Sequence, residues 1–517
     1  MNLRNRLLGL CTAAAVTAVL VTACAPSSTT SSKSSDSGKP RDGGSITIGV
    51  GEALTTWNTV NALTVTDFQV IKEVFEPLVV NNADGTGIQG GLADSYSYDK
   101  SRTTLTFKLP PKATFSDGTP LTSADVAFSV GFWKKGGSGA LYDTIKKVST
   151  PNPHEVVFHL AAPNSGLLPV LTWASSAVVR EDFGGKSAKD YFAHPVGSGP
   201  FMVNNYTPGS NEIVLKKNPT YHKAGLPHLD QVTYKVTSDP NQRVLQYKSG
   251  GIDVYDQVSP DLTVQLPKDE LTSVPGAVLS AVTFNVRPKA GITSNVDFRK
   301  AVSLALDRKG LVDSVYAGQG SVAEAALTPH EPGFVKCGAC DYPRQNIAAA
   351  KAALAKSGYK GQPVELAVDS SNASNVLAAQ AIQPMLKAVG IKMTVKPQDV
   401  TTLISRATEG TIQMSITTYR ATSLTLNDIL SLWYSTSAFF SGEDTAPILA
   451  GVQAVAAAKD TAQLRAAAAQ VEKFVFQSKF WVPVADLDVT FAVNPRVKGL
   501  TVNPLVLYNL SDIYVTG

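Results

Sequence analysis

The chain has 517 residues, a formal net charge of +4 and 17% charged residues. A chain of this length can form two or more domains, each with a hydrophobic core of its own. The small net charge gives no electrostatic basis for binding nucleic acid, so nucleic acid is not expected as a partner.

The amino-terminal segment has the pattern of an export signal. Arg4 and Arg6 precede an apolar run over residues 7–20, which is too short to span a bilayer comfortably. Cys24 follows small residues, as in a lipobox, which predicts a lipid on its sulfur and cleavage before it. The alternative is an ordinary secretory signal with a chance cysteine. Residues 25–42 are rich in Ser and Thr and poor in apolar side chains, which predicts a flexible tether.

The first element expected after the tether is a strand over residues 45–50, because apolar residues alternate there. A polar loop over residues 51–62 follows this strand. Ligands of open α/β sheets bind at loops that follow strands. Three residues of this loop are therefore candidate ligand contacts: Glu52, Trp57 and Asn58.

Residues 104–133 predict a strand, a turn and a helix. Alternation over residues 105–109 predicts a strand with one buried face, and Ser116-Asp117-Gly118 predicts a turn. Thr122 and Asp125 have the spacing of a capping box at the start of a helix. Three apolar residues then fall on one face of this helix: Val126, Val130 and Trp133.

Further elements support an α/β architecture. The Pro151-Asn152-Pro153 run predicts a hairpin turn. Helices are predicted over three more segments: residues 67–75, 297–306 and 345–357. Later, three elements follow one another: a strand over 364–368, a helix over 375–389 and a strand over 391–396. This order requires a crossover and predicts a parallel pair of strands, so periodicity supports α/β lobes joined by crossovers.

The cysteines are few. Cys11 lies in the expected signal, which leaves Cys337 and Cys340 as a close pair. Outside the cytoplasm such a pair favours a small disulfide loop, with free thiols as the alternative. A zinc site needs two more ligands, and His330 is the only nearby candidate.

Motifs of enzymes are incomplete in this chain. Gly185-Lys186-Ser187 resembles the end of a phosphate loop, but Arg180 occupies the position of its first Gly. Ser357 and Lys360 have the Ser-x-x-Lys spacing of penicillin-binding enzymes, but no Ser-Asp-Asn follows. The sequence also lacks Gly-x-Ser-x-Gly and His-Glu-x-x-His. No catalytic residue, cofactor or metal is therefore expected.

The string FSDGTPLT over residues 115–122, followed by Ala124-Asp125-Val126, strongly resembles a family signature. It is similar to that of the family 5 extracytoplasmic solute-binding proteins, the dipeptide and oligopeptide receptors of ABC importers. The resemblance spans about residues 43–510. Other blocks match in the same order, among them residues 74–78, 91–96, 196–201, 217–221, 249–253, 283–285, 298–302, 306–308 and 389–391.

The resemblance implies a two-lobed α/β periplasmic-binding-protein fold, type II and cluster C, with an extra subdomain in the first lobe. Two connecting strands, near residues 281–284 and 479–483, would form the hinge. The expected parts are a signal peptide (1–23), a tether (24–42), a first lobe (43–75, 196–280 and 480–517), its subdomain (76–195) and a second lobe (281–479).

The resemblance also implies how a ligand is held. The ligand lies between the lobes, closure buries it, and the closed form docks on the permease. Peptide-binding members hold the ligand as an added strand through its backbone. The contacts are expected from the loop that contains Glu52 and Asn58 and from residues 417–425, with Asn285 as a further candidate in a matching block.

The second contact segment departs from the pattern of peptide-binding members. They have an aromatic residue followed three residues later by Asp, whose carboxylate pairs with the free ammonium of the peptide. Tyr419 occupies the aromatic position, but Thr422 replaces the Asp, and the nearest acid is Asp428. Arg420 instead introduces a positive charge that suits a ligand carboxylate. Tyr419, Arg420 and Thr422 are the candidates from this segment.

Together these patterns predict a lipid-anchored, monomeric receptor on the outer face of the cytoplasmic membrane. It would bind peptides and deliver them to ABC permease subunits. The alternatives are an oligosaccharide receptor, another small-solute receptor or an exported hydrolase. Aromatic residues available to stack on sugar rings are Trp57, Tyr419, Trp433 and Trp481.

Overall fold

The computed structural model describes residues 40–516 except residues 63, 84, 86, 332, 337–341, 343, 421–445 and 459–460. Residues 40–517 form one compact unit. The expected signal peptide and most of the tether thus lie outside the described residues. Within the described part of the chain, no helix combines the length and the apolar character needed to cross a membrane.

One mixed sheet of 11 strands runs through the described chain, with β13 (Gly320–Val322) paired to β17. The other strands lie in the order β15 (Met393–Gln398), β14 (Val364–Asp369), β16 (Met414–Arg420), β12 (Leu271–Phe284), β17 (Trp481–Val493), β11 (Val254–Val258), β1 (Ser45–Val50), β10 (Gln231–Val236), β9 (Glu212–Lys217) and β8 (Phe201–Asn205).

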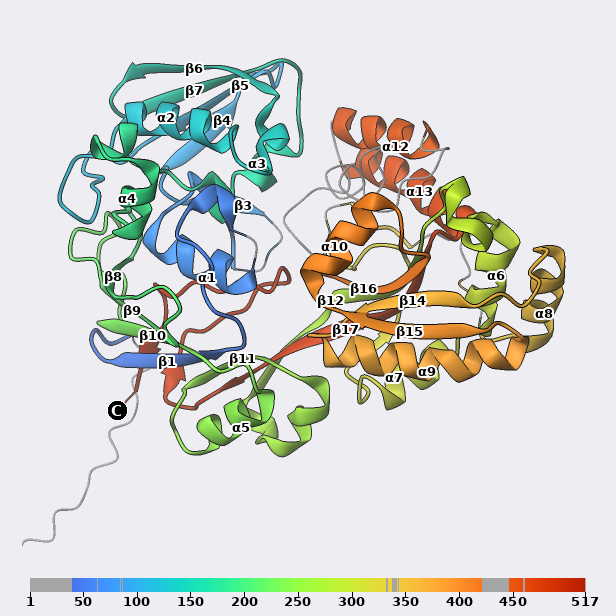
Figure 1. The fold of residues 1–517 in the computed structure, drawn as a ribbon. Helices are drawn as coiled ribbons and strands as arrows, with labels where there is room; N and C mark the ends of the chain where they lie inside the picture. The colour runs from blue at the N-terminus through green and yellow to red at the C-terminus, as the bar shows by residue number, and fades with distance from the viewer. Residues whose placement is uncertain are drawn as a thin grey trace, which may run out of the picture. The chain divides into compact units, whose positions relative to one another are not determined.

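Strands β12 and β17 are the longest and lie in the middle of this order. They pair antiparallel from Leu271 opposite Ala492 to Thr283 opposite Trp481, and Figure 1 shows them running side by side between the two halves of the sheet. Strand β12 contains the expected residues 281–284, and β17 begins at Trp481, within the expected segment 479–483. We call β12 and β17 the crossing strands; their role as a hinge stays a prediction.

The half of the sheet that contains β1 has a core of its own. Strand β1 is parallel to β10 and β11, while β8, β9 and β10 are antiparallel. Helix α1 (Val65–Val74) begins with a capping box made by Thr64 and Asp67, and helix α5 (Pro240–Lys248) precedes β11. Buried residues of this core include Ile48, Phe75 and Phe491.

A separate four-stranded antiparallel sheet forms the expected subdomain region, in the order β4 (Ser95–Tyr98), β5 (Thr104–Lys108), β7 (Glu155–Leu160) and β6 (Ile145–Asn152). The predicted hairpin is confirmed, because β6 and β7 pair around the turn at residues 152–155. The predicted capping box is also confirmed: Thr122 and Asp125 cap helix α2 (Ser123–Trp133). Other elements of this region include β2 (Val79–Asn81), β3 (Ile88–Gly90), α3 (Leu167–Val170) and α4 (Ala188–Ala193).

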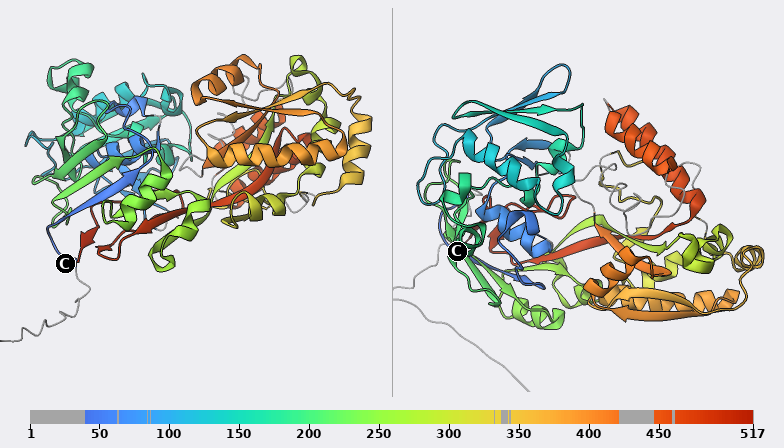
Figure 2. Two further views of the ribbon diagram at one scale, coloured as in Figure 1. Left: turned by 60° about the horizontal axis from the view of Figure 1, so that its bottom comes forward. Right: turned by 45° about the horizontal axis from the view of Figure 1, so that its top comes forward.

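The other half of the large sheet contains the predicted parallel pair. Helix α9 (Ala373–Val389) connects β14 to the parallel strand β15, and Figures 1 and 2 show it lying along these strands. Gly390 ends this helix with a φ of 97°, which glycine adopts without a steric penalty. Further helices among the described residues are α6 (Val296–Ala305), α7 (Arg308–Ser314), α8 (Ile347–Lys356), α10 (Val400–Glu409), α12 (Ala446–Ala457) and α13 (Thr461–Ser478).

The carboxyl-terminal segment returns to the first half after β17. It contains the short pair β18 (Val497–Lys498) and β19 (Tyr514–Val515). Arg496 holds this segment in place, since its guanidinium donates to both carboxylate oxygens of Asp253, each at 2.7 Å. Asp253 also accepts a hydrogen bond from the backbone N–H of Thr47 at 2.8 Å, so the pair ties the end of the chain to β1.

Candidate functional site

Four polar residues from three distant segments meet beside the crossing strands. We call them the Arg420 cluster: Glu52, Asp256, Gln257 and Arg420. Arg420 Nη2 donates a hydrogen bond to Gln257 Oε1. Burial lowers the pKa of Arg420, and the negative charges of Asp256 and Glu52 oppose that shift. The structure therefore brings together two of the predicted ligand contacts, Glu52 from the loop after β1 and Arg420 from β16.

Gln257 has an unusual backbone. Its φ is 59°, and the pairing of β11 with β17 shifts register between Tyr255 and Val258. A left-handed residue in a strand is costly unless its surroundings hold it there, and bulges of this kind redirect a side chain. The irregularity accompanies the hydrogen bond that Gln257 accepts from Arg420. Sequence reasoning missed it, because no Gly or Pro marks the position.

Asp256 is buried next to this bulge, with 6% of its surface exposed. Its Oδ2 accepts a hydrogen bond from the Tyr508 hydroxyl at 3.1 Å, while Oδ1 is buried and has no hydrogen-bond partner among the described residues. Burial raises the pKa of Asp256, and the Tyr508 bond and the charge of Arg420 oppose that shift. Asp256 Oδ1 is therefore a free acceptor at the edge of the Arg420 cluster.

Tyr419 and Arg420 project from opposite faces of β16, because side chains alternate along a strand. Tyr419 is 7% exposed and lies opposite Leu279 of β12, in a hydrophobic cluster that also contains Trp481. The two second-lobe candidates thus face different surroundings. Other predicted residues lie outside the described residues: Cys24, Cys337, Cys340, Thr422, Asp428 and Trp433.

Trp57 was expected as a ligand contact in a polar loop, but its side chain is buried. The indole is only 4% exposed and packs edge-on against Tyr206, with ring centroids 5.6 Å apart. It belongs to the core that contains Phe75 and Ile48, because the loop after β1 folds inward at Leu54 and Trp57. Its Nε1 is buried without a hydrogen-bond partner among the described residues. Trp57 is therefore a core residue in this structure.

The two candidate asparagines support the backbone. Asn58 caps the short helix over Thr59–Asn61, and its Oδ1 accepts from Val60 N at 3.3 Å. Asn285 is 4% exposed; its Nδ2 donates to Gly410 O at 2.7 Å and its Oδ1 accepts from Arg287 N at 3.1 Å. Both groups of the Asn285 amide are thus engaged within the protein, which leaves its predicted ligand contact without structural support.

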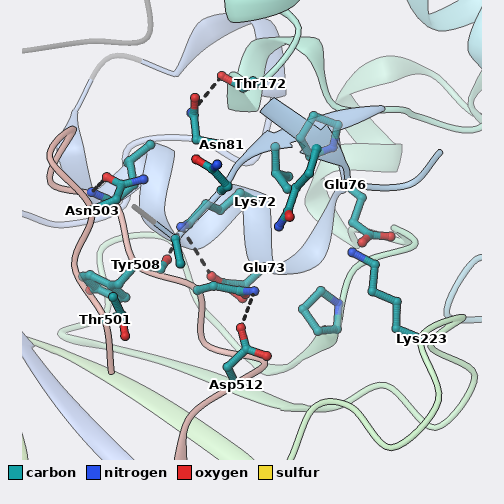
Figure 3. A pocket seen from close by; sticks show the side chains of 18 of the residues that line it. Lys72, Glu73, Glu76, Asn81, Thr172, Lys223, Thr501, Asn503, Tyr508 and Asp512 are labelled. Carbon is teal, nitrogen blue, oxygen red and sulfur yellow. Dashed lines mark hydrogen bonds and ion pairs between the residues drawn. The ribbon is translucent and has the colours of Figure 1, made fainter. Parts of the chain in front are cut away.

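A cavity of about 200 Å³ lies elsewhere, in the half of the chain that contains α1 (Figure 3). Lys72 and Glu73 line it and form an ion pair at 3.8 Å, and Lys72 Nζ also donates to the carbonyl of Tyr508. Burial raises the pKa of Glu73 to about 7, opposed by the charge of Lys72. Pockets for drug-sized ligands usually measure about 300–1,000 Å³. None of the residues that line this cavity comes from residues 281–479, so it is not a site between the expected lobes.

Comparison with known proteins places the chain in a family. Residues 87–441 match the family model described as bacterial extracellular solute-binding proteins, family 5 middle. The chain is 28% identical to the oligopeptide-binding protein AppA of Bacillus subtilis, over 73% of this chain and 74% of AppA. It is 24% identical to the probable D,D-dipeptide-binding periplasmic protein DdpA of Escherichia coli, over 86% of this chain and 90% of DdpA.

The fold agrees with this placement. The structure of the PBP AgaA of A. tumefaciens R10, in complex with agropinic acid, superposes with a TM-score of 0.79. The two chains are 26% identical, and the match covers 92% of this chain and 99% of AgaA. The expected two-lobed α/β fold is confirmed. The chain therefore belongs to the bacterial extracellular solute-binding proteins of family 5, and its role is that of a solute-binding receptor.

Proposed function

We propose that this protein is the receptor of an ABC importer that captures peptides between its two lobes and delivers them to a permease. The observation that carries the proposal is the Arg420 cluster, in which polar residues from both expected lobes meet beside the crossing strands. The names of AppA and DdpA, which both match across more than two thirds of this chain, favour peptides as the solute.

The cluster suits a ligand that is bound by its backbone. Arg420 and Gln257 offer N–H donors, and Asp256 Oδ1 offers an acceptor that no described residue uses. Peptide C=O and N–H groups are complementary to such a set. A ligand that binds both lobes favours the closed state, and closure is the signal that a permease can recognise.

A non-peptide solute is the second candidate. Two observations favour it: Thr422 replaces the acid that peptide-binding members use, and the 26% identical AgaA was crystallised with agropinic acid. Arg420 is a suitable partner for the carboxylate of a small acid. In both cases the protein binds its solute without converting it, acts as a monomer and uses no cofactor.

The proposal includes attachment to the outer face of the cytoplasmic membrane by a lipid on Cys24. An apolar signal followed by small residues and Cys24 supports this attachment. The Ser- and Thr-rich residues 25–42 would then act as the tether between the lipid and the folded chain.

Native mass spectrometry of the chain from Ala25 onward, purified from its own host, tests the proposed solute. This form retains the whole unit that starts at residue 40. Peptides of mixed mass that co-purify with the protein are the expected result. A protein that carries only a single non-peptide acid, or that sugars alone stabilise against heat, would contradict the peptide proposal and support the second candidate.

A further inference from the structure

The two strands that flank β12 each carry a polar residue on the same face of the sheet as Leu279. Tyr419 of β16 and Asp486 of β17 both lie directly opposite Leu279 of β12. Residues directly opposite one another in antiparallel strands share a face. Tyr419, Leu279 and Asp486 therefore form one row across three strands, and the carboxyl of Asp486 lies on the Tyr419 side of the sheet.

Two more acids lie next to this row. Glu472 of α13 accepts hydrogen bonds from the backbone N–H of Ala326 at 3.0 Å, and Glu331 accepts one from Thr328 N at 2.9 Å. Glu331 also forms a side-chain hydrogen bond with Tyr419. We call Glu331, Glu472 and Asp486 the carboxyl cluster; their exposed fractions are 3%, 2% and 6%.

The three acids influence one another electrostatically. Burial raises the pKa of Glu331 well above its usual range, and the charges of Glu472 and Asp486 raise it further. Burial also raises the pKa of Glu472 to about 8 and that of Asp486 to about 7. The charge of Lys336 opposes the shift in the Asp486 pKa, but the Lys336 side chain is exposed and paired with Glu324. Lys336 is thus a solvent-exposed counter-charge for Asp486.

Two oxygens of the cluster also lack a partner. Glu331 Oε1 and Asp486 Oδ1 are buried, and neither has a hydrogen-bond partner among the described residues. Such groups are costly in a protein interior unless something binds them. The described residues contain no group of three or more His, Cys, Asp and Glu side chains placed to hold a metal ion. Free carboxyl oxygens can accept the N–H donors of an organic cation.

We propose that the carboxyl cluster is the anchor for an ammonium group of the ligand, and that it takes the place of the acid that Thr422 lacks. The proposal rests on the proposed solute-binding function and names the feature that the solute must carry. An ammonium group has three donors, which the free oxygens of Asp486 and Glu331 can accept. Tyr419, next to Glu331, would form one wall of this anchor.

A solute mixture with and without free amines tests the proposal. Purified protein from Ala25 onward is stripped of ligand, incubated with yeast extract or with the same extract acetylated by acetic anhydride, washed, and analysed by native mass spectrometry. Acetylation converts ammonium groups into neutral amides and leaves carboxylates intact. We expect at least tenfold higher occupancy with the untreated extract.

Three variants test whether the acids of the carboxyl cluster cause the preference for the untreated extract. Asp486→Asn should bring the occupancy ratio close to one, because the amide keeps the shape and removes the charge. Glu331→Gln is a second variant of the cluster and should lower the ratio in the same way. Glu324→Gln removes an exposed acid near Asp486 and should keep the wild-type ratio.

The results of this experiment distinguish a failure of the proposed ammonium anchor from a failure of the proposed peptide-binding function. Captured amines that are not peptides would support the anchor and contradict the peptide proposal. Peptides captured equally from both extracts, or a ratio that Asp486→Asn and Glu331→Gln both leave unchanged, would overturn the anchor alone. A wild-type protein that captures nothing from either extract would contradict both.

Discussion

Arg420 at the end of β16 donates a hydrogen bond to Gln257 on β11, although both crossing strands lie between β16 and β11 in the sheet. The bond joins residues from the two expected lobes. If Arg420 also binds the ligand, Arg420→Ala should weaken the affinity for a peptide recovered from the native protein by at least about 1 kcal/mol, the low end for a charged hydrogen bond. Isothermal titration calorimetry measures this loss.

Gln257→Ala is the matched control for that prediction. It removes the partner of Arg420 and leaves the guanidinium in place, so it should cost less affinity than Arg420→Ala. Equal losses in the two variants would mean that Gln257, through its bond to Arg420 or its own contact with the ligand, contributes as much to the affinity as Arg420 does. An unchanged affinity in Arg420→Ala would place this side chain out of reach of the ligand.

The lipid anchor can be tested by one substitution outside the described residues. Cys24→Ser removes the sulfur that would carry the lipid, so the protein should appear in the soluble fraction or keep its signal peptide. Membrane fractionation and intact mass measure both effects. A variant with the mass and membrane association of the wild type would refute the anchor.

Cys337 and Cys340 are expected to form a disulfide in the exported protein. The native protein should then resist alkylation by iodoacetamide, and should take up two alkyl groups after reduction. Two alkyl groups before reduction would show free thiols instead. Protection that a chelator abolishes without any reductant would indicate a bound metal.

Local pattern predicted much of the fold. The strand β5, the capping box of Thr122 and Asp125, the hairpin of β6 and β7 and the parallel pair of β14 and β15 all follow from neighbouring residues, so the sequence was sufficient for them. The full length of the crossing strands could not be predicted from neighbouring residues. Their pairing joins residues about 200 positions apart, and periodicity carries no information on such contacts.

The candidate site was harder to predict for the same reason. Trp57 was a candidate ligand contact because its neighbours in the chain are polar, but the residue that packs against it is the distant Tyr206. A signal did exist for two acids that were missed. Asp486 interrupts an apolar strand at a buried position, and Glu472 shares a buried helix face with Ala468 and Val475. An acidic residue at a position that the hydrophobic pattern assigns to the buried face indicates a partner or a function.

Arg299 provides a stability test within a block that matches the family. Its guanidinium donates to the carbonyls of Thr293, Ser294 and Ser478, each at 2.8 Å, and it is 6% exposed. Arg299→Met keeps the volume of the stem but leaves these carbonyls without their donor. Urea unfolding should show a loss of about 3 kcal/mol, since each buried acceptor left unpaired costs about 1–3 kcal/mol.

The neighbouring Lys300 is the control for this change, because it is exposed. Lys300→Met should alter the free energy of unfolding by no more than about 0.5 kcal/mol, as surface substitutions usually do. Equal effects of the two substitutions would mean that the three hydrogen bonds of Arg299 contribute nothing beyond the loss of a charge.

Glu472 should make the protein less stable as the pH rises. Its pKa is raised by burial from 4.5 to about 8, so between these values the folded state keeps a proton that the unfolded state has released. The contribution of Glu472 to stability is therefore complete below pH 4.5 and is lost as the pH rises toward 8. The free energy of unfolding should fall by up to about 1.4 kcal/mol per pH unit in this range.

Glu472→Gln removes this titration, so its stability should depend less steeply on pH between about 5 and 8 than that of the wild type. Urea unfolding at several pH values measures both slopes. Glu324→Gln is the control, since its side chain is 59% exposed, and it should keep the wild-type slope. A wild-type slope in Glu472→Gln would mean that Glu472 is already ionised in the folded protein at neutral pH, and that a cation inside the structure compensates its charge.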